Sequence, residues 1–587
     1  MNYLRIYKGK FIERPNRFIA YIEIEGKKET VHVKNTGRCA ELLIPGVTVY
    51  VQKSDNPERK TGWDLIAVEK GERIVNMDSQ IPNYVVKEWI EKELLFQDIS
   101  LIKPEKTYGK SRIDLYVEYG ENRKAFIEVK GVTLENDGVV LFPDAPSKRA
   151  VKHVEELIGA VKEGYEACLF FVVQMNNVKY FTPNRVTQPA FADALVKAKK
   201  AGVRIVAYDC KVTEDTITID SEVPVILENT ELYEMTDPIV KWFQQNKRDL
   251  PWRKNINAYR VWLSEIMLQQ TRVEAVKPYF ERFLDNLPTI KDLAEVEEDR
   301  LFKLWEGLGY YNRVKNMQKA AQKIMAEYHG EFPAEFEEIL SLPGIGSYTA
   351  GAISSFAFQK ARPAVDGNVL RVISRVLMMY DDIAKASVKK KVEEMLQEVI
   401  PEQNPGDFNQ GLIELGAMIC VPNGEPKCEE CPVNKICRAY KEGCQSELPV
   451  KKKQKERRIE KRTVLILKDE GTVAVRKRPD KGLLAGLYEF PNIEGWMSMD
   501  EVIEYCKEIG LIPVHVQEIG EAKHIFSHIE WKMKGYVVRV DELEKNCRIP
   551  LIFADPEEIS RTYSIPSAFD KYTRYANCKD EKKTDTD

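Results

Sequence analysis

Two acidic residues stand in contrasting surroundings in the middle of the chain. Glu265 lies in an apolar segment, Trp262–Leu268, and Asp366 lies in the motif Ala364–Val369. Burial among apolar neighbours is expected to raise the pKa of Glu265, which suits a general acid. Asp366 is expected at a helix start, where backbone N–H groups favour the ionised form of a stabiliser or nucleophile. Paired carboxylates of this kind cleave glycosidic bonds; the alternative is a surface Glu and an N-cap Asp.

A cysteine cluster is the second pattern with a chemical meaning. Cys420, Cys428, Cys431 and Cys437 are separated by seven, two and five residues. Four thiolates at such short spacing can fold a loop around a metal centre. The spacing leaves tetrahedral zinc and a [4Fe–4S] cluster both open, and chance clustering of structural cysteines is the alternative.

A third pattern lies in the first third of the chain. Asp114 precedes an apolar, strand-like segment, Ala125–Gly131, that carries Glu128 and Lys130. Alternation along a strand puts Glu128 and Lys130 on one face. This is the PD-(D/E)xK nuclease pattern, in which Asp114 and Glu128 would chelate Mg²⁺ or Mn²⁺ and Lys130 would orient water. A surface Glu–Lys pair is the competing interpretation.

The segment Leu340–Ala350 contains a Leu-Pro-Gly-x-Gly hairpin between two expected helices. Gly344 and Gly346 let the backbone approach a phosphate, and the following helix offers free N–H groups to an anion. An ordinary helix C-cap and turn would look the same.

Composition sets the frame for these motifs. The chain has 587 residues, which suggests about four domains. Its net charge is −4, so any nucleic-acid surface must be local. No apolar run approaches the ~18 residues that a membrane span needs, and Met1–Lys10 lacks the apolar core of a secretory signal. Eleven cysteines, mostly scattered, fit a reducing cytosol better than a disulfide framework.

The elements that must position the motifs follow the chain in blocks. Residues 1–80 read as short strands of a small β-barrel, and residues 81–229 as an α/β domain. Residues 236–445 are helical in period and include the cysteine loop. A basic segment, 446–462, is either a solvated linker or a phosphate-contacting one. Residues 463–573 are again mixed α/β, and the tail 574–587 is expected to be disordered.

The helical block resembles the endonuclease III superfamily of helix-hairpin-helix DNA glycosylases, most closely the MutY-type A/G-specific adenine glycosylases. The resemblance covers residues 236–573. It rests on the hairpin, the aspartate motif, the cysteines and three further segments: Lys247–Arg253, Trp262–Arg272 and Trp305–Tyr311. It implies that the cysteines hold a [4Fe–4S] cluster, although the first cysteine interval is one residue longer than is usual in the family.

The resemblance also implies roles for individual residues. Bifunctional relatives carry a lysine where this chain has Tyr348, so we expect base removal without lyase chemistry, with Tyr348 helping to stabilise the sugar cation. Flipping of the adenine implies that Gln270 and Tyr310 wedge into the base stack. The residues expected to contact DNA are Arg248, Arg253, Gln270, Arg272, Tyr310, Gly344, Gly346 and Asn368.

The last block contains Arg476–Pro491, which resembles the Nudix-like domain of adenine glycosylases. The paired glutamates that bind Mg²⁺ in Nudix hydrolases do not follow, so we expect a recognition domain and no pyrophosphatase. The run His524–His528 matches the loop that reads 8-oxoguanine in the family. The resemblance gives Ser527 and His528 hydrogen bonds to the oxidised base and makes Phe526 a wedge.

Residues 1–229 resemble the sugar fermentation stimulation protein A family, which joins an OB-like barrel to a PD-(D/E)xK nuclease-like domain. The resemblance rests on segments that include Asn35–Gly37, Ser54–Pro57 and Phe142–Ala145, with Arg149 and His153. Members have been treated both as DNA-binding regulators and as nucleases. Glu88, Glu91 or Glu93 would be candidates for a further metal ligand.

We therefore interpret the chain as a fusion of four folds, an expected cytoplasmic, nucleoid-associated monomer. Its carboxyl-terminal part would excise adenine from double-stranded DNA opposite 8-oxoguanine or guanine. Two alternatives remain open. The amino-terminal half is a non-catalytic DNA-binding module, or the whole chain is a metal-dependent nuclease with the glycosylase half as damage sensor.

Overall fold

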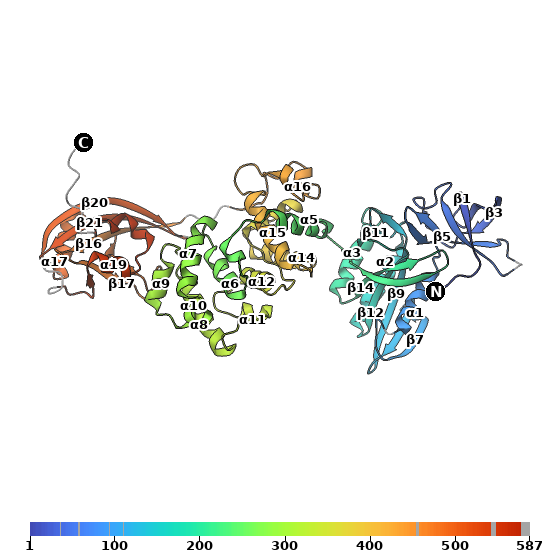
Figure 1. The fold of residues 1–587 in the computed structure, drawn as a ribbon, viewed down its shortest axis with the longest axis horizontal. Helices are drawn as coiled ribbons and strands as arrows, with labels where there is room; N and C mark the ends of the chain where they lie inside the picture. Colours follow the sequence, from blue (N-terminus) through green and yellow to red (C-terminus); the bar gives the residue numbers. More distant parts are fainter. Residues whose placement is uncertain are drawn as a thin grey trace. The chain divides into compact units, whose positions relative to one another are not determined.

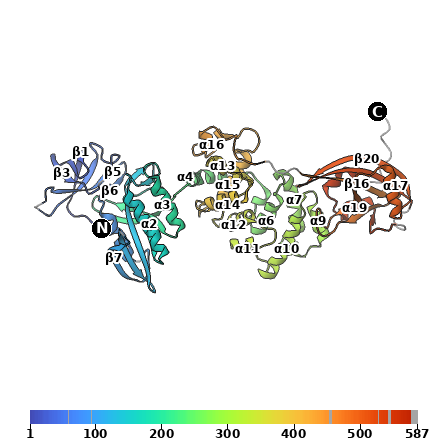
Figure 2. The ribbon, with the colours of Figure 1, turned by 180° about the vertical axis from the view of Figure 1, so that it is seen from behind.

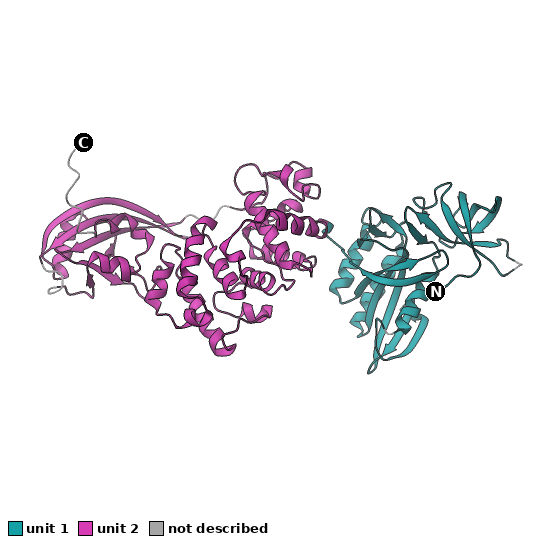
Figure 3. Cartoon of the chain, in the orientation of Figure 1, with its two compact units in different colours: residues 1–230 teal, residues 231–587 magenta. Residues whose placement is uncertain are grey.

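The computed structural model describes residues 1–35, 37–56, 59–92, 94–109, 111–452, 457–526, 528–541 and 547–576. The chain divides into two compact units, Met1–Thr230 and Glu231–Asp587, drawn in teal and magenta in Figure 3. Among the described residues, no helix is long and apolar enough to cross a membrane.

The first unit begins with a closed β-barrel. Its sheet has the order β3-β2-β1-β4-β5-β6, and a parallel pairing of β3 with β5 closes it. Alternating apolar residues of these strands, such as Ala20, Ile22 and Val49, are fully buried inside. The strands are β1 (Ile6–Asn16), β2 (Ile19–Ile24), β3 (Lys27–His32), β4 (Thr48–Lys53), β5 (Trp63–Lys70) and β6 (Arg73–Asn76).

A second six-stranded sheet, in the order β15-β14-β12-β9-β8-β7, follows in the same unit. A small sheet, β10-β11-β13, lies beside it. The strands are β7 (Ile99–Tyr108), β8 (Ser111–Tyr119), β9 (Arg123–Val132), β10 (Leu134–Asn136), β11 (Val139–Phe142), β12 (Glu166–Val173), β13 (Tyr180–Pro183), β14 (Arg204–Val212) and β15 (Ile217–Val223).

Helices cover both faces of this six-stranded sheet. Helices α2 (Lys148–Lys162) and α3 (Pro189–Lys200), both labelled in Figure 2, pack on one face, and α1 (Ile81–Glu91) packs on the other. Strand β12 shows why, because its residues alternate between two cores. Leu169 and Phe171 pack with α2 and α3, whereas Phe170 and Val172 pack with α1. A strand buried on both faces needs the continuous apolar run that this one has.

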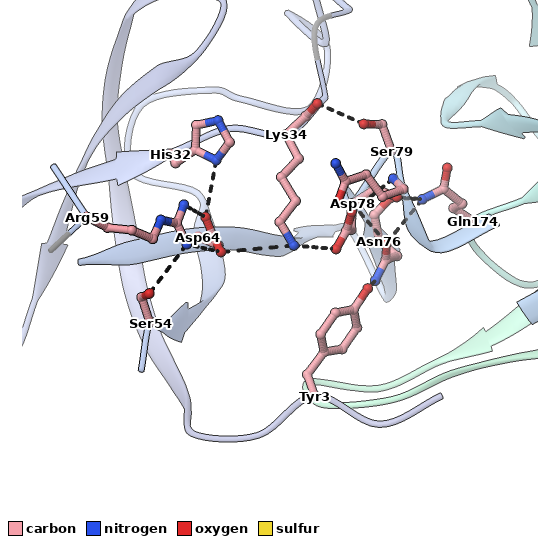
Figure 4. Close-up of polar contacts among 11 residues, drawn as sticks. Tyr3, His32, Lys34, Ser54, Arg59, Asp64, Asn76, Asp78, Ser79 and Gln174 are labelled. Atoms are coloured by element: carbon pink, nitrogen blue, oxygen red, sulfur yellow. Dashed lines mark hydrogen bonds and ion pairs between the residues drawn. The ribbon is translucent and has the colours of Figure 1, made fainter. Parts of the chain in front are cut away.

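A buried amide joins the barrel to the second sheet. Gln174, which directly follows β12, is 1% exposed. Its Nε2 donates to the side-chain and backbone oxygens of Asn76, at 3.1 and 3.2 Å, and to the Asp78 carbonyl at 3.0 Å (Figure 4). The Asp78 side chain in turn accepts a hydrogen bond from Lys34 Nζ through its Oδ2, at 2.7 Å. Since buried polar groups are costly without partners, these bonds fix the barrel against the sheet.

The second unit starts with a helical domain, drawn from green to yellow in Figure 1. Its helices are α4 (Thr230–Glu234), α5 (Thr236–Asn246), α6 (Ala258–Met267), α7 (Val273–Asn286), α8 (Ile290–Glu295), α9 (Glu298–Trp305), α10 (Asn312–Glu327), α11 (Phe336–Leu340), α12 (Ser347–Phe356), α13 (Gly367–Val376), α14 (Ala386–Gln397), α15 (Pro405–Met418) and α16 (Arg438–Lys441).

Close backbone packing sets the spacing between α12 and the segment that leads to α13. A Cβ atom added to Gly351, in the middle of α12, would lie 2.0 Å from the Pro363 carbonyl oxygen. Only glycine therefore fits at this position. The contact holds α12 close to Asp366, which caps the amino end of α13.

A mixed sheet, drawn in orange to red in Figure 1, completes the unit. Strand β16 pairs with the long hairpin β20–β21, and the path runs β18-β17-β16-β21-β20. The elements are β16 (Arg458–Lys468), β17 (Val473–Lys477), β18 (Tyr488–Glu489), β19 (Asn492–Glu494), α17 (Met499–Glu508), β20 (Pro513–Ile525), β21 (Ile529–Val540), β22 (Ile552–Ala554), α19 (Pro556–Thr562) and α20 (Asp570–Thr573).

The close approach at Gly351 can be tested by adding one methyl group. We expect Gly351→Ala to destabilise the second unit by about 1–3 kcal/mol, because the new Cβ has to push backbone apart. Gly367→Ala is the matched control, since a Cβ there meets nothing within 4 Å. Differential scanning calorimetry of both variants measures the effect. Equal melting temperatures for the two would show that the helix spacing is not constrained at Gly351.

Candidate active sites

The helical domain encloses a cavity of about 620 Å³. The three residues predicted to be catalytic line it, each from a different element: Glu265 from α6, Tyr348 from α12 and Asp366 from the amino end of α13. Residues 83 and 101 positions apart in the sequence are thus brought to one cavity, large enough to admit a flipped base.

Glu265 is a desolvated acid. It is 7% exposed, and Tyr348 Oη donates to its Oε2 at 2.5 Å. The pKa of Glu265 is raised to about 7, chiefly by burial and then by the negative charge of Asp366, against the lowering effect of the Tyr348 hydrogen bond. Near neutral pH this carboxyl group is therefore available as a proton donor.

Asp366 is the N-cap of α13. Its Oδ1 accepts the Val369 N–H at 2.8 Å, and its Oδ2 accepts Asn368 Nδ2 at 2.7 Å. The sequence-based expectation was that these N–H groups dominate and favour the ionised form. Burial is the larger effect, however, and it raises the pKa of Asp366 above its ordinary value. Asn368, expected to contact DNA, supports this carboxylate and accepts from Arg371 Nη2 at 2.8 Å.

Arg248 and Arg253 line the same cavity, but they are bound to a residue that the sequence analysis did not single out. Glu414, on α15, is 1% exposed and accepts from both guanidinium groups. The Arg248 Nε–Oε1 and Arg253 Nη2–Oε2 distances are 2.7 and 3.0 Å. These bonds outweigh burial and lower the pKa of Glu414 to about 2. The sequence signal that could have identified Glu414 is the one used for Glu265, a single acidic residue within an apolar segment.

A second cavity, of about 770 Å³, lies between the helical domain and the mixed sheet of the same unit. Gln270, Tyr310, Phe526 and His528 all line it, and Gln270 lines the first cavity as well. Phe526 is partly buried and packs edge-on against Trp531, with ring centroids 5.0 Å apart. The predicted Ser527 lies outside the described residues.

The remaining predicted DNA contacts, at Arg272, Gly344 and Gly346, lie in turns and at the starts of helices. Arg272 lines the first cavity and caps α7. Gly344 has a φ of +79°, a conformation that favours glycine, and Gly346 is the N-cap of α12. The hairpin glycines therefore stand at the amino end of the helix that carries Tyr348.

The four cysteines of the cluster line one small apolar pocket beside α13. Arg375 Nη1 donates to Cys420 Sγ at 3.1 Å. The extra residue of the first interval is accommodated in a loop, because Lys427 N–H returns to the Ile419 carbonyl at 3.0 Å and Gly424 takes a φ of +78°. Across the described residues, no three His, Cys, Asp or Glu side chains converge tightly enough for a single metal ion.

The two metal centres that the spacing left open make different demands on the thiolates. A single tetrahedral zinc draws four sulfurs to about 2.3 Å from one point. A four-iron cluster spreads its thiolates over a larger body. Four cysteines around one pocket supply the thiolate donors that either centre requires.

The amino-terminal unit brings Asp114 and Glu128 together on β8 and β9. Asp114 accepts Asn83 Nδ2 at 3.1 Å and the Val129 N–H at 2.9 Å. Burial, and then the charge of Glu128, raises the pKa of Asp114. Glu128 is 1% exposed, and Lys130 and His153 both pair with its Oε1. Although burial opposes it, these partners lower the pKa of Glu128.

One oxygen of this site is unused. Glu128 Oε2 is buried and has no hydrogen-bond partner among the described residues. The acids considered as further ligands lie elsewhere: Glu88 pairs with the Met1 amino group, and Glu91 with Lys87. Glu93 lies outside the described residues. The site thus offers two carboxylates and a free oxygen, a set that suits a hard divalent cation completed by water or phosphate.

Comparison with known proteins assigns a family to each part. Residues 12–77 match the SfsA N-terminal OB domain, and residues 80–216 the sugar fermentation stimulation protein RE domain. Residues 263–402 match the HhH-GPD superfamily base excision DNA repair protein, and residues 462–575 the NUDIX domain. The predicted order of folds is confirmed.

Individual relatives cover single parts of the chain. A sugar fermentation stimulation protein homologue of Clostridium beijerinckii is 60% identical over 227 residues, 39% of this chain and 100% of the relative. A structure of Pyrococcus furiosus SfsA in complex with Ca²⁺ is 30% identical and covers 38% of this chain and 98% of its own, with a TM-score of 0.36. A non-covalent endonuclease III–DNA complex is 25% identical over 37% of this chain and 99% of its own, with a TM-score of 0.33.

The amino-terminal match spans the whole length of its relative at an identity far above chance. The chain therefore belongs to the sugar fermentation stimulation protein family, and it continues beyond that family's length as a helix-hairpin-helix base excision DNA repair glycosylase domain and a NUDIX domain.

Proposed function

We propose that the carboxyl-terminal unit removes adenine from double-stranded DNA in which adenine is mispaired with 8-oxoguanine or guanine. The observation that carries this proposal is the trio in the first cavity. A carboxyl group that holds a proton near neutral pH, Glu265, faces a second carboxylate, Asp366, across Tyr348. Two carboxylates in unlike states are what cleavage of a glycosidic bond requires.

The reaction follows from these positions. Glu265 donates its proton to a ring nitrogen of the flipped adenine, and the C1′–N9 bond breaks with its electron pair moving to the base. Asp366, ionised, stabilises the positive charge left on the sugar. Water adds through its oxygen to C1′ and gives its proton to a carboxylate. Tyr348 offers no amine for a Schiff base, so the strand is not cut.

The walls of the two cavities support the choice of substrate. The ionised Glu414 offers an acceptor and its two arginines offer donors, a set that matches the amine and ring nitrogens of adenine. Gln270 lines both cavities. From this position its side chain would fill the gap that a flipped base leaves in the stack. His528 is exposed in the second cavity, where it can reach the opposite base.

The cysteine loop is proposed to hold a [4Fe–4S] cluster through Cys420, Cys428, Cys431 and Cys437. Bound there, the cluster would supply cross-linking of the loop and of α13. Arg375, which donates to Cys420 Sγ, would stabilise the thiolate form of that ligand.

A second activity is proposed for the amino-terminal unit, because Glu128 Oε2 is buried without a partner. Asp114 and Glu128 would hold Mg²⁺ or Mn²⁺, which would supply charge neutralisation at a phosphodiester. Lys130, beside Glu128, would orient the attacking water. The alternative is a module that binds nucleic acid without cutting it.

Glu265→Gln tests the acid. We expect at least a 10³-fold loss of adenine release, since the amide cannot donate a proton of comparable acidity, while affinity for the mispaired duplex stays within threefold. Single-turnover release of adenine and a gel-shift titration measure the two quantities. Release at the parental rate would refute the assignment of Glu265.

The pH dependence of the rate tests the raised pKa. The protonated form of Glu265 is the active one, so single-turnover rates should fall as the pH rises through about 7. The Tyr348 hydrogen bond lowers the pKa of Glu265, so Tyr348→Phe should move this midpoint to higher pH as well as slow the reaction. A midpoint that stays unchanged in Tyr348→Phe would show that another group titrates.

The nuclease proposal is best tested in the Glu265→Gln background, where base removal cannot produce breaks. We expect Mn²⁺-dependent, EDTA-sensitive cutting of single- or double-stranded DNA or RNA that drops at least tenfold in Asp114→Asn. Asp193→Asn is the matched control, because Asp193 pairs with Arg185 on the exposed surface. Absence of cutting on every substrate would contradict the nuclease and favour the binding module.

A further inference from the structure

One arginine outside the predicted set connects the two loops that carry Gln270 and Tyr310. Arg313 lies in the first turn of α10. Its Nη1 donates to the carbonyls of Ile266 and Gln269, at 2.6 and 2.7 Å, and more weakly to Met267 at 3.3 Å. Its Nη2 donates to the carbonyls of Leu308 and Gly309, at 3.0 and 3.1 Å. One guanidinium group thus binds five carbonyl oxygens from two loops.

Two of the carbonyls that Arg313 binds lie directly before the predicted wedge residues. The Gln269 carbonyl belongs to the peptide group directly before Gln270, and the Gly309 carbonyl to the one directly before Tyr310. Both Gln270 and Tyr310 adopt left-handed backbone, with φ of 60° and 49°. Such a conformation costs a non-glycine residue of order 1–3 kcal/mol and persists only where its surroundings fix it. The same cation therefore fixes the peptide plane before each strained residue.

The environment of Arg313 suits a permanent tether. The guanidinium carbon lies 5.4 Å from the Trp305 ring centroid and 5.5 Å from that of Tyr310. Ile266 and Met267 end α6, where carbonyls lack helical partners and the helix dipole favours a cation. Burial lowers the pKa of Arg313 to about 10, so the group stays charged at neutral pH.

We propose that Arg313 is a positioning residue that holds Gln270 and Tyr310 together in the arrangement needed to extrude a base. The inference rests on the proposed glycosylase function and deepens it. The free-energy cost of the two left-handed residues is included in folding, so DNA binding does not have to supply it. Both residues then present themselves at the second cavity as one preformed wedge. Tyr310, half exposed there, is free to enter a base stack.

Arg313→Lys is the discriminating variant, because lysine keeps the charge but cannot bridge two loops with one rigid fork. Arg282→Lys is the matched control. Arg282 also donates a guanidinium N–H to a backbone carbonyl at the end of a helix, that of Leu304 in α9 at 2.9 Å. It lies 4.6 Å from the Tyr279 ring centroid and has no hydrogen bond to either wedge residue.

The first measurement needs no DNA and so does not depend on the proposed substrate. We expect hydrogen–deuterium exchange of peptides covering 266–272 and 306–312 to accelerate together at least fivefold in Arg313→Lys, and neither to change in Arg282→Lys. Unchanged exchange in either loop would overturn the tether, whatever the substrate of the enzyme.

The second measurement uses a duplex with 2-aminopurine in place of the adenine opposite 8-oxoguanine. We expect Arg313→Lys to reduce the fluorescence rise on binding. On a matching duplex that retains the adenine, we expect it to slow adenine release at least tenfold, with the pH midpoint of the rate unchanged. A shifted midpoint would mean that Arg313 acts through Glu265 at the end of α6, which overturns the wedge role. Failure of the parental chain to release adenine would instead refute the proposed function.

Discussion

The proposed chemistry of the helical domain depends on one physical condition, the exclusion of water from the carboxyl group of Glu265. Glu265 keeps its proton only because α6, α12 and the start of α13 exclude water from it. Two cations stand in the same cavity and would, if free, favour its ionised form. Glu414 binds both Arg248 and Arg253, and its own pKa falls to about 2 as a result. The ion-pair network therefore protects the acid as well as shaping the cavity wall.

The two candidate sites use the same type of residue in opposite ways. Glu128 and Glu265 are both buried glutamates. Burial favours the protonated form of both. The pKa of Glu128 is nevertheless lowered because His153 and Lys130 lie against it, whereas burial raises the pKa of Glu265 because its hydrogen-bond partner, Tyr348, brings no positive charge to offset it. An ionised carboxylate suits a metal ligand and a protonated one suits a general acid. The neighbour, and not the depth of burial, separates the two chemistries.

Much of this could be predicted from the sequence, because the motifs are local. The hairpin, the aspartate motif and the strand with Glu128 and Lys130 each fix a short stretch of backbone, and the order of folds followed from them. Partners distant in sequence could not be predicted. Glu414 lies 166 positions from Arg248, and only the packing of α15 brings them together. The direction of the pKa shift at Asp366 was also predicted wrongly, because the burial that raises this pKa depends on helices that the motif does not contain.

The joint at Gln174 has a consequence for how the amino-terminal half behaves as a piece of protein. Its amide hydrogens find their acceptors only across the boundary, on Asn76 and Asp78. Separation of the barrel from the sheet would break these hydrogen bonds and expose the buried surfaces around Gln174 to water. The two folds should thus lose structure in a single cooperative transition. The barrel and the sheet should therefore behave as one structural module, on which a stabilising or destabilising change in either part acts as a whole.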